Sequence, residues 1–250
     1  GAIERFALGE MRSSEAPFLE FAIERSEGKG EGPAILWRTK VFSPLGGSRW
    51  GQIALTPSAR YTALLDVDCN VRLFDQTGKQ SADGVSLKGR QPAVKASRSA
   101  DLVVAASSDS LLALDMRGYR QRRLSLKNEW ATHFDISPKG IFFAVADFFR
   151  GVSLFDETLD RSQYLETSSD VLDIAVDGNH HTLISLADST LAFYNDRGAL
   201  ISQTDVLKPS VSVVTGLGQG FLTASAGHVR AYTSDGGVVW SLDVPGEVNS

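Results

Sequence analysis

The chain has only one cysteine, Cys69, among its 250 residues. A single cysteine excludes a disulfide within the chain, and such sparse use is typical of a reducing compartment. No run of about 18 apolar residues is present, so we expect no membrane-spanning helix and no direct insertion into a membrane. The first residues lack the basic segment and apolar core of a signal peptide. These features predict a cytoplasmic location, and the alternatives are a removed signal peptide or an excised extracytoplasmic domain.

Positive charge is also scarce, and the formal net charge is −5. Nucleic acids and anionic membranes bind basic surfaces, so we expect neither as a partner. The sequence contains no Gly-x-Ser-x-Gly elbow, no P-loop and no dinucleotide-binding fingerprint. The four histidines are scattered without ligand spacing on one strand face. We therefore expect a protein that is not an enzyme and that holds no metal or other cofactor.

Five aspartates fall where we expect the turns between the second and third strands of a repeat: Asp66, Asp68, Asp109, Asp147 and Asp188. A ring of carboxylates at one rim is a conceivable metal site. Aspartate is also a common turn residue, because its side chain accepts hydrogen bonds from nearby backbone amides. We interpret these residues as turn residues.

A repeated strand-and-turn segment is the main positive feature of the sequence. Its first copy is Val71-Arg72-Leu73-Phe74-Asp75 followed by Gly78, in which apolar residues of high strand propensity run into a turn. Asp75 is expected to accept backbone hydrogen bonds there, and Gly78 is expected to adopt the left-handed conformation. Further copies end at Asp115, Asp156, Asn195 and Thr233, a spacing of about 40 residues that indicates a repeat architecture. Leu159 stands where the third copy should have glycine.

Five repeats follow from this spacing, at about 50–92, 93–130, 131–169, 170–208 and 209–244. Each contains four short strand-like segments separated by turn residues. Four strands in a repeat of about 40 residues are typical of one blade of a β-propeller. The sequence therefore predicts an all-β fold and a single β-propeller domain over residues 1–250.

The two ends of the chain predict a sixth blade. Residues 1–44 contain strand candidates around Phe6, Phe21 and Trp37, and residues 245–250 have the pattern of an inner strand. We expect these segments to form one composite blade that closes the ring, which gives six four-stranded blades. The alternative is a fragment of a larger ring.

Two segments resemble known repeat families. Residues 227–243, GHVRAYTSDGGVVWSLD, resemble a repeat of the PQQ-like propellers, and residues 136–146, ISPKGIFFAVA, resemble the Ser-Pro-Asp-Gly turn of WD40-like repeats. The resemblance covers roughly residues 34–250 and implies a propeller that serves as a scaffold or sensor. The Gly-His and Trp-Asp pairs of true WD40 repeats are missing. One cysteine cannot supply the vicinal pair of quinoprotein dehydrogenases, so the resemblance implies no quinone cofactor.

A set of aromatic and arginine residues is the candidate site for a protein or peptide partner. These residues lie in loops between blades or in the turn between the second and third strands of the third repeat, and both kinds of connection emerge on one face of a propeller. Aromatic and arginine side chains are common anchors of protein interfaces. Packing between blades is the alternative interpretation. The candidates are Arg49, Trp50, Trp130, Phe148, Phe149 and Arg150.

The central channel is the runner-up site, which would make the protein a small-ligand sensor or an enzyme. The expected starts of the inner strands are Gln52, Lys95, His133, Asp173 and Ser212. This mixed set indicates no particular reaction. We therefore predict a non-catalytic scaffold for protein–protein interactions, and a structural subunit of a larger complex is the third interpretation.

Overall fold

The computed structural model describes residues 4–8, 18–25, 34–42, 52–56, 60–65, 69–87, 89, 92–97, 100–115, 120–126, 131, 133–147, 151–156, 158–206, 212–215, 219–225 and 228–243. Within these ranges the regular elements are all β-strands, as the sequence predicts. No helix in the described ranges is long and apolar enough to span a membrane.

The strands form antiparallel sheets of neighbours in chain order. The N-terminal sheet has three strands, β1 (Glu4–Leu8), β2 (Phe18–Arg25) and β3 (Ala34–Phe42). Five four-stranded sheets follow, which we name I to V. Sheet I contains β4 (Gln52–Leu55), β5 (Tyr61–Leu65), β6 (Asn70–Asp75) and β7 (Gln80–Ser86); sheet II contains β8 (Ala93–Ala96), β9 (Leu102–Ser107), β10 (Ser110–Asp115) and β11 (Arg120–Ser125). Sheet III contains β12 (His133–Ile136), β13 (Phe142–Ala146), β14 (Gly151–Asp156) and β15 (Arg161–Glu166). Sheet IV contains β16 (Val171–Val176), β17 (Thr182–Leu186), β18 (Thr190–Tyr194) and β19 (Leu200–Asp205); sheet V contains β20 (Ser212–Thr215), β21 (Phe221–Ser225), β22 (His228–Tyr232) and β23 (Val238–Asp243).

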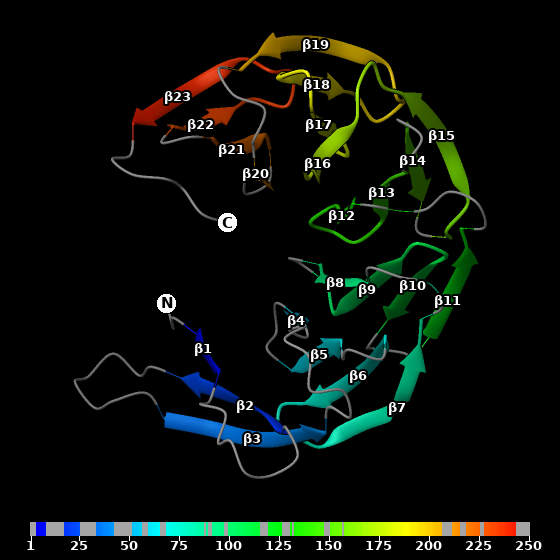
Figure 1. Cartoon of the computed structure of the whole chain (residues 1–250), viewed down its shortest axis with the longest axis vertical. Coiled ribbons are helices and arrows are strands. Elements are labelled where there is room, and N and C mark those ends of the chain that lie inside the picture. Colours follow the sequence, from blue (N-terminus) through cyan, green and yellow to red (C-terminus); the bar gives the residue numbers. More distant parts are fainter. Residues whose placement is uncertain are drawn as a thin grey trace.

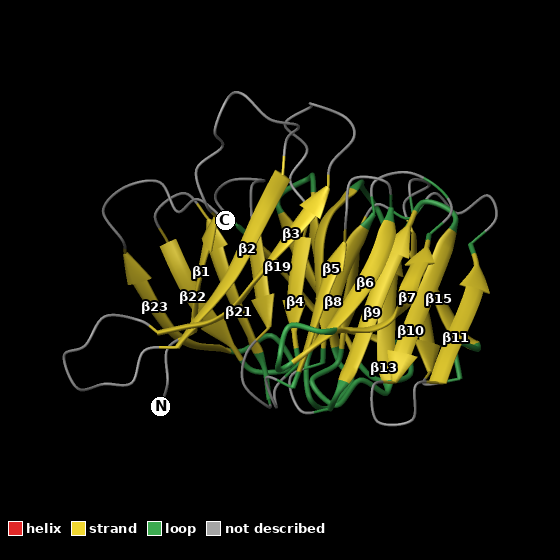
Figure 2. Cartoon of the chain, turned by 90° about the horizontal axis from the view of Figure 1, so that it is seen from below, coloured by secondary structure: helices red, strands yellow, loops and turns green. Residues whose placement is uncertain are grey.

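Figure 1 shows the sheets following one another in chain order around an arc. The first strand of each four-stranded sheet lies innermost and the last lies at the perimeter. Seen from the side, the strands run across the thickness of the arc, so connections gather on two opposite faces (Figure 2). The arrangement is consistent with a β-propeller. Among the described residues the arc is not closed, because a gap separates sheet V from the N-terminal sheet. Residues 245–250 lie outside the described residues, so the composite closing blade stays a prediction.

The repeated turn has the chemistry that the sequence predicts. Asp75 Oδ1 accepts hydrogen bonds from the backbone N–H groups of Thr77 and Lys79, at 2.8 and 3.1 Å. Gly78 has a φ angle of 78°. Leu159 adopts the same left-handed conformation at 64°, a region that is unfavourable for a branched side chain. Its side chain is 5% exposed and packs in the core between sheets II and III, which offsets the cost of this conformation.

The core is divided into layers between successive sheets. In β14, Val152 and Leu154 pack in a cluster with residues of sheet IV, whereas Phe155 packs in a cluster with residues of sheet II. Adjacent strand residues point to opposite faces, so a strand covered on both faces must be apolar at nearly every position. This explains why the middle strands show little alternation of apolar and polar residues.

Candidate functional site

The aromatic and arginine candidates all lie outside the described residues. The set comprises Arg49, Trp50, Trp130, Phe148, Phe149 and Arg150. The interpretation that they form a partner-binding face therefore stays a prediction. Two described residues close to them in the chain, Gln52 and Ala131, line a cavity.

A cavity of about 350 Å³ lies where the inner strands begin. Its polar wall comes from four successive sheets, through Gln52 of β4, Lys95 of β8, His133 of β12 and Asp173 of β16. The structure thus brings together four residues that the sequence places at the channel. Lys95 and Asp173 do not begin their strands as expected but lie two residues further along, since β8 begins at Ala93 and β16 at Val171. The remaining lining residues are Pro92, Ala93, Ala106, Ser107, Ala131 and Phe134.

Lys95 is positioned by a carboxylate of the next sheet. Its Nζ lies 2.9 Å from Asp135 Oδ1 and 5.6 Å from the centre of the Phe134 ring. The other oxygen of Asp135 accepts the backbone N–H of Val176, at 2.9 Å. Asp135 is only 7% exposed, so one buried carboxylate in sheet III connects sheets II and IV. Asp135 was not among the residues predicted at the channel, although a charged residue inside a short apolar inner strand indicates a polar role for that side chain.

His133 lies between charges of opposite sign in this cavity. Burial of the imidazole is the main cause that lowers the pKa of His133; Asp173 acts in the opposite direction, and Lys95 lowers the pKa further. The neutral ring is therefore favoured near neutral pH. Gln52 accepts the backbone N–H of Val94 through Oε1, at 2.9 Å, which fixes its amide beside the cavity.

The cavity contains serine, histidine and aspartate, which raises the question of nucleophilic catalysis. Ser107 is 1% exposed, and its hydroxyl lies 3.3 Å from the hydroxyl of Ser110. It also accepts the backbone N–H of Asp109, at 3.4 Å. Ser107 is thus part of a tight turn. The arrangement offers an ammonium group, a carboxylate, an imidazole and an amide, which suits the binding of polar groups.

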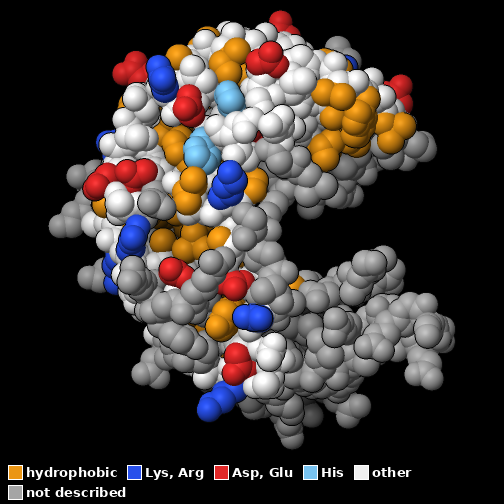
Figure 3. Space-filling model, turned by 180° about the vertical axis from the view of Figure 1, so that it is seen from behind, with side chains coloured by type: hydrophobic (Ala, Val, Ile, Leu, Met, Phe, Trp, Pro, Cys, Tyr) orange, Lys and Arg blue, Asp and Glu red, His pale blue; other side chains and the backbone are white. Residues whose placement is uncertain are grey.

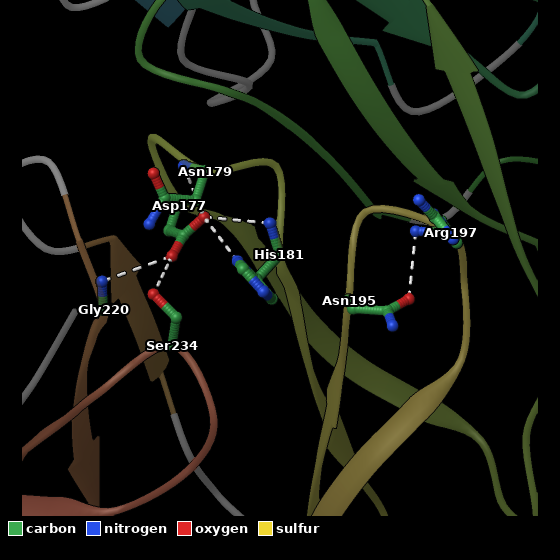
Figure 4. Close-up of polar contacts among 7 residues, drawn as sticks. All are labelled: Asp177, Asn179, His181, Asn195, Arg197, Gly220 and Ser234. Atoms are coloured by element: carbon green, nitrogen blue, oxygen red, sulfur yellow. Dashed lines mark hydrogen bonds and ion pairs between the residues drawn. The ribbon is translucent and has the colours of Figure 1, made fainter.

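The opposite face carries a buried carboxylate that connects two sheets (Figure 4). Asp177 is 0% exposed, and its Oδ1 accepts the backbone N–H groups of Asn179 and His181 in its own turn, at 2.8 and 2.9 Å. Its Oδ2 accepts the N–H of Gly220, at 3.3 Å, and the hydroxyl of Ser234, both from the segments of sheet V. Asp177 therefore fastens sheet IV to sheet V.

The position of Asp177 recurs after each of the first four inner strands. The hydroxyl of Ser97 donates to the carbonyl of Pro138 and so connects sheets II and III. Ser137 accepts the backbone N–H of Phe142, at 3.2 Å. Sequence reasoning missed this series, but an oxygen-bearing side chain recurs about every 40 residues in Thr56, Ser97, Ser137 and Asp177.

The two adjacent histidines have structural contacts on this face. The ring of His180 stacks on Phe142, with ring centres 5.4 Å apart. Burial is the main cause that lowers the pKa of His180. His181 Nδ1 lies 3.6 Å from Asp177 Oδ1. In the part of the chain that the structure describes, no three His, Cys, Asp or Glu side chains gather as a metal site would require.

Of the described aspartates predicted as turn residues, Asp147 and Asp188 accept backbone N–H groups of their own turns, and Asp109 accepts the hydroxyl of Ser108, at 2.7 Å. Asp147 accepts the backbone N–H of Gly151 and the phenol of Tyr164, at 3.0 and 2.9 Å. Asp188 accepts the backbone N–H of Thr190, at 3.2 Å. Asp66 and Asp68 lie outside the described residues.

A scan against models of known protein families and a search of curated proteins both found no match. The resemblance to PQQ-like and WD40-like repeats therefore stays a prediction based on the two segments that carry it. The function must be inferred from the geometry of the cavity and the surfaces around it.

Proposed function

We propose that the chain is a six-bladed β-propeller of the PQQ-like or WD40-like kind, and that it is a non-catalytic interaction module for a protein or peptide. Five four-stranded sheets in chain order around an arc support this architecture. The N-terminal sheet has three strands, one fewer than a blade. In the proposed ring, residues 245–250 supply its missing inner strand.

The cavity at the starts of the inner strands carries the proposal of a binding role. Gln52, Ala93, His133 and Asp173 occupy equivalent positions, since each pairs with the second strand of its own sheet four residues before the shared turn position. Positions that serve only the fold carry similar residues in every repeat. This position has a different residue in each of these sheets, and chemical variety on one surface is what recognition of an irregular partner requires.

We propose that the aromatic candidates, which lie outside the described residues, belong to the face that carries the cavity. The turn that contains Phe148 and Phe149 begins just after Ala146, which pairs with His133 at the cavity wall. Trp130 directly precedes the cavity residue Ala131. A peptide that inserts one polar side chain into the cavity would therefore meet aromatic residues at its rim, and such anchors dominate the affinity of many interfaces.

A peptide selection tests this function. A random-peptide phage library is panned on the immobilised protein, and the dissociation constants of the enriched peptides are measured for the wild type and for Asp173→Asn. The matched control is Asp160→Asn, an exposed carboxylate in a turn at the opposite face. We expect at least a tenfold weaker affinity for Asp173→Asn, or about 1.4 kcal/mol, and no change for the control. The absence of enriched peptides would refute the proposal. Equal dissociation constants for the wild type and Asp173→Asn would also refute it.

A small-ligand sensor or enzyme is the second candidate function, and the cavity volume favours it. About 350 Å³ falls within the range of known small-molecule sites, roughly 300–1,000 Å³. Native mass spectrometry of the purified protein, followed by thermal-shift measurements with a metabolite library, tests this alternative. A ligand that raises the melting temperature of the wild type but not of Asp173→Asn would favour it over peptide binding.

A further inference from the structure

Sheet V has an apolar face at the end of the arc that is exposed in β23 and half-buried in β21 and β22. Its Phe221 and Tyr232 pack against Phe193 of sheet IV, with ring centres 5.9 and 5.4 Å apart. Because strand residues alternate between faces, the residues between them point away from sheet IV. We call this set the open face of sheet V; it consists of Leu222, Ala224, Val229, Ala231, Trp240 and Leu242. Figure 3 shows a hydrophobic patch at this end of the arc, beside the gap.

The third-strand positions of this face are buried in the other four-stranded sheets. The register of the third and fourth strands pairs Val229 with Leu242, and the equivalent pairs are Val71 with Val85, Leu111 with Leu124, Val152 with Leu165, and Leu191 with Thr204. The third-strand members of those four pairs are each 0% exposed. Among the fourth-strand members, Leu165 is 5% exposed and Val85, Leu124 and Thr204 are half-buried, whereas Leu242 is 56% exposed.

The following sheet explains this burial. Val71 packs in a cluster with sheet II, Leu111 in a cluster with sheet III, Val152 with sheet IV and Leu191 with sheet V. Each of these sheets therefore buries one face against the next sheet in the chain. The face of sheet V has apolar third-strand residues at the same register, but no further sheet follows it in the described part of the chain. The face is thus exposed because no sheet covers it, and not because it is made of polar residues.

Trp240 adds to the apolar character of this face. It pairs with Ala231, and the residues at its position in sheets I to IV are Ala82, Arg122, Gln163 and Ser202. Small or polar residues thus occupy this position where a following sheet is present. In sheet V a tryptophan that is 46% exposed occupies it. A contiguous apolar surface of this kind marks an interaction site.

We propose that the open face of sheet V is the closing interface of the ring and that its occupant is the N-terminal sheet of the same chain. The N-terminal sheet lies at the other end of the arc, across the gap from sheet V (Figure 1). It is antiparallel with strands in chain order, as are the sheets that cover the equivalent faces. The inference rests on the proposed propeller, but not on the proposed peptide binding.

A pair of substitutions in one strand tests the closure. Leu242→Asp places a charge on the open face. Val238→Asp is the matched control, because Val238 is 60% exposed but pairs with Tyr232 on the opposite side of the sheet. The positions equivalent to Val238 are exposed even in enclosed sheets, at Gln80, Arg161 and Leu200. We expect Leu242→Asp in the full chain to lower the melting temperature by about 5–10 °C and the control to change it by no more than about 1 °C.

Two further measurements identify the occupant. Hydrogen exchange followed by mass spectrometry should become faster in residues 4–42 of Leu242→Asp but not of the control. Analytical ultracentrifugation should show a monomer for the wild type. Equal melting temperatures for the two variants would show an open face and overturn the proposal. Faster exchange confined to residues 221–243, or a wild-type dimer that Leu242→Asp dissociates, would overturn the N-terminal sheet as the occupant. Peptide binding, measured with Asp173→Asn, can fail independently of all these outcomes.

Discussion

Replacing Asp177 with alanine should release sheet V from sheet IV. The carboxylate is 0% exposed and is the only acceptor within its own turn for two backbone N–H groups, those of Asn179 and His181, among the described contacts. It also accepts the N–H of Gly220 and the hydroxyl of Ser234 from the segments of sheet V. Asp177→Ala removes the partner of all four groups at once.

The expected loss can be worked from these contacts. A hydrogen bond to a charged group contributes about 1.5–3 kcal/mol, and a buried donor left without a partner costs about 1–3 kcal/mol. The four bonds share one carboxylate and are not additive, so we expect a loss of about 3–5 kcal/mol in the free energy of unfolding. Asp177→Asn keeps an acceptor for the turn but turns an amide NH₂ toward sheet V, and it should lose about half as much.

Equilibrium unfolding in urea, followed by circular dichroism, measures both losses. Asp156→Ala serves as a control, because Asp156 accepts the same kind of turn bonds, from Thr158 and Asp160 at 2.8 and 3.2 Å, in an exposed position. Its loss should be clearly smaller than that of Asp177→Ala. A loss below about 1 kcal/mol for Asp177→Ala would refute the reasoning, because it would mean that water replaces the carboxylate at little cost.

Two further predictions concern the cavity. Lys95→Met should lower the free energy of unfolding by about 1–2 kcal/mol, since it removes the ion-pair partner of the buried Asp135 while Lys95 itself is 42% exposed. Denaturant unfolding checks this. The double variant Lys95→Met with Asp135→Asn should not recover full stability, because an amide oxygen is a weaker acceptor for the N–H of Val176 than a carboxylate oxygen. Burial lowers the pKa of His133 below 6.5, so the stability that its neutral ring contributes is present above that pH and is lost as the pH falls. The free energy of unfolding should therefore decline less between pH 7 and pH 5 in His133→Gln than in the wild type, and identical pH profiles would contradict this assignment.

Local sequence signals predicted the repeated elements well, because strands and turns depend on nearby residues. The Asp75 turn and the left-handed Gly78 follow from residues within five positions of each other. Leu159 shows the limit of such signals, since a left-handed leucine is tolerated only through burial between two sheets. The cavity residues could be recognised in the sequence as inner-strand residues, but the residues that they contact in neighbouring sheets could not be predicted.

The sequence by itself determined the all-β class, the spacing of the repeats and the chemistry of the turns. All three depend on contacts within one repeat of about 40 residues. Only the tertiary structure decided which carboxylates fasten neighbouring sheets, because Asp135 and Asp177 meet backbone groups of the next sheet, 41 and 43 residues away. It also distinguished the open face of sheet V from four equivalent buried faces. The third strand is apolar at this register in all of them. The presence of a following sheet, which is a property of the whole arrangement, decides whether the face meets protein or water.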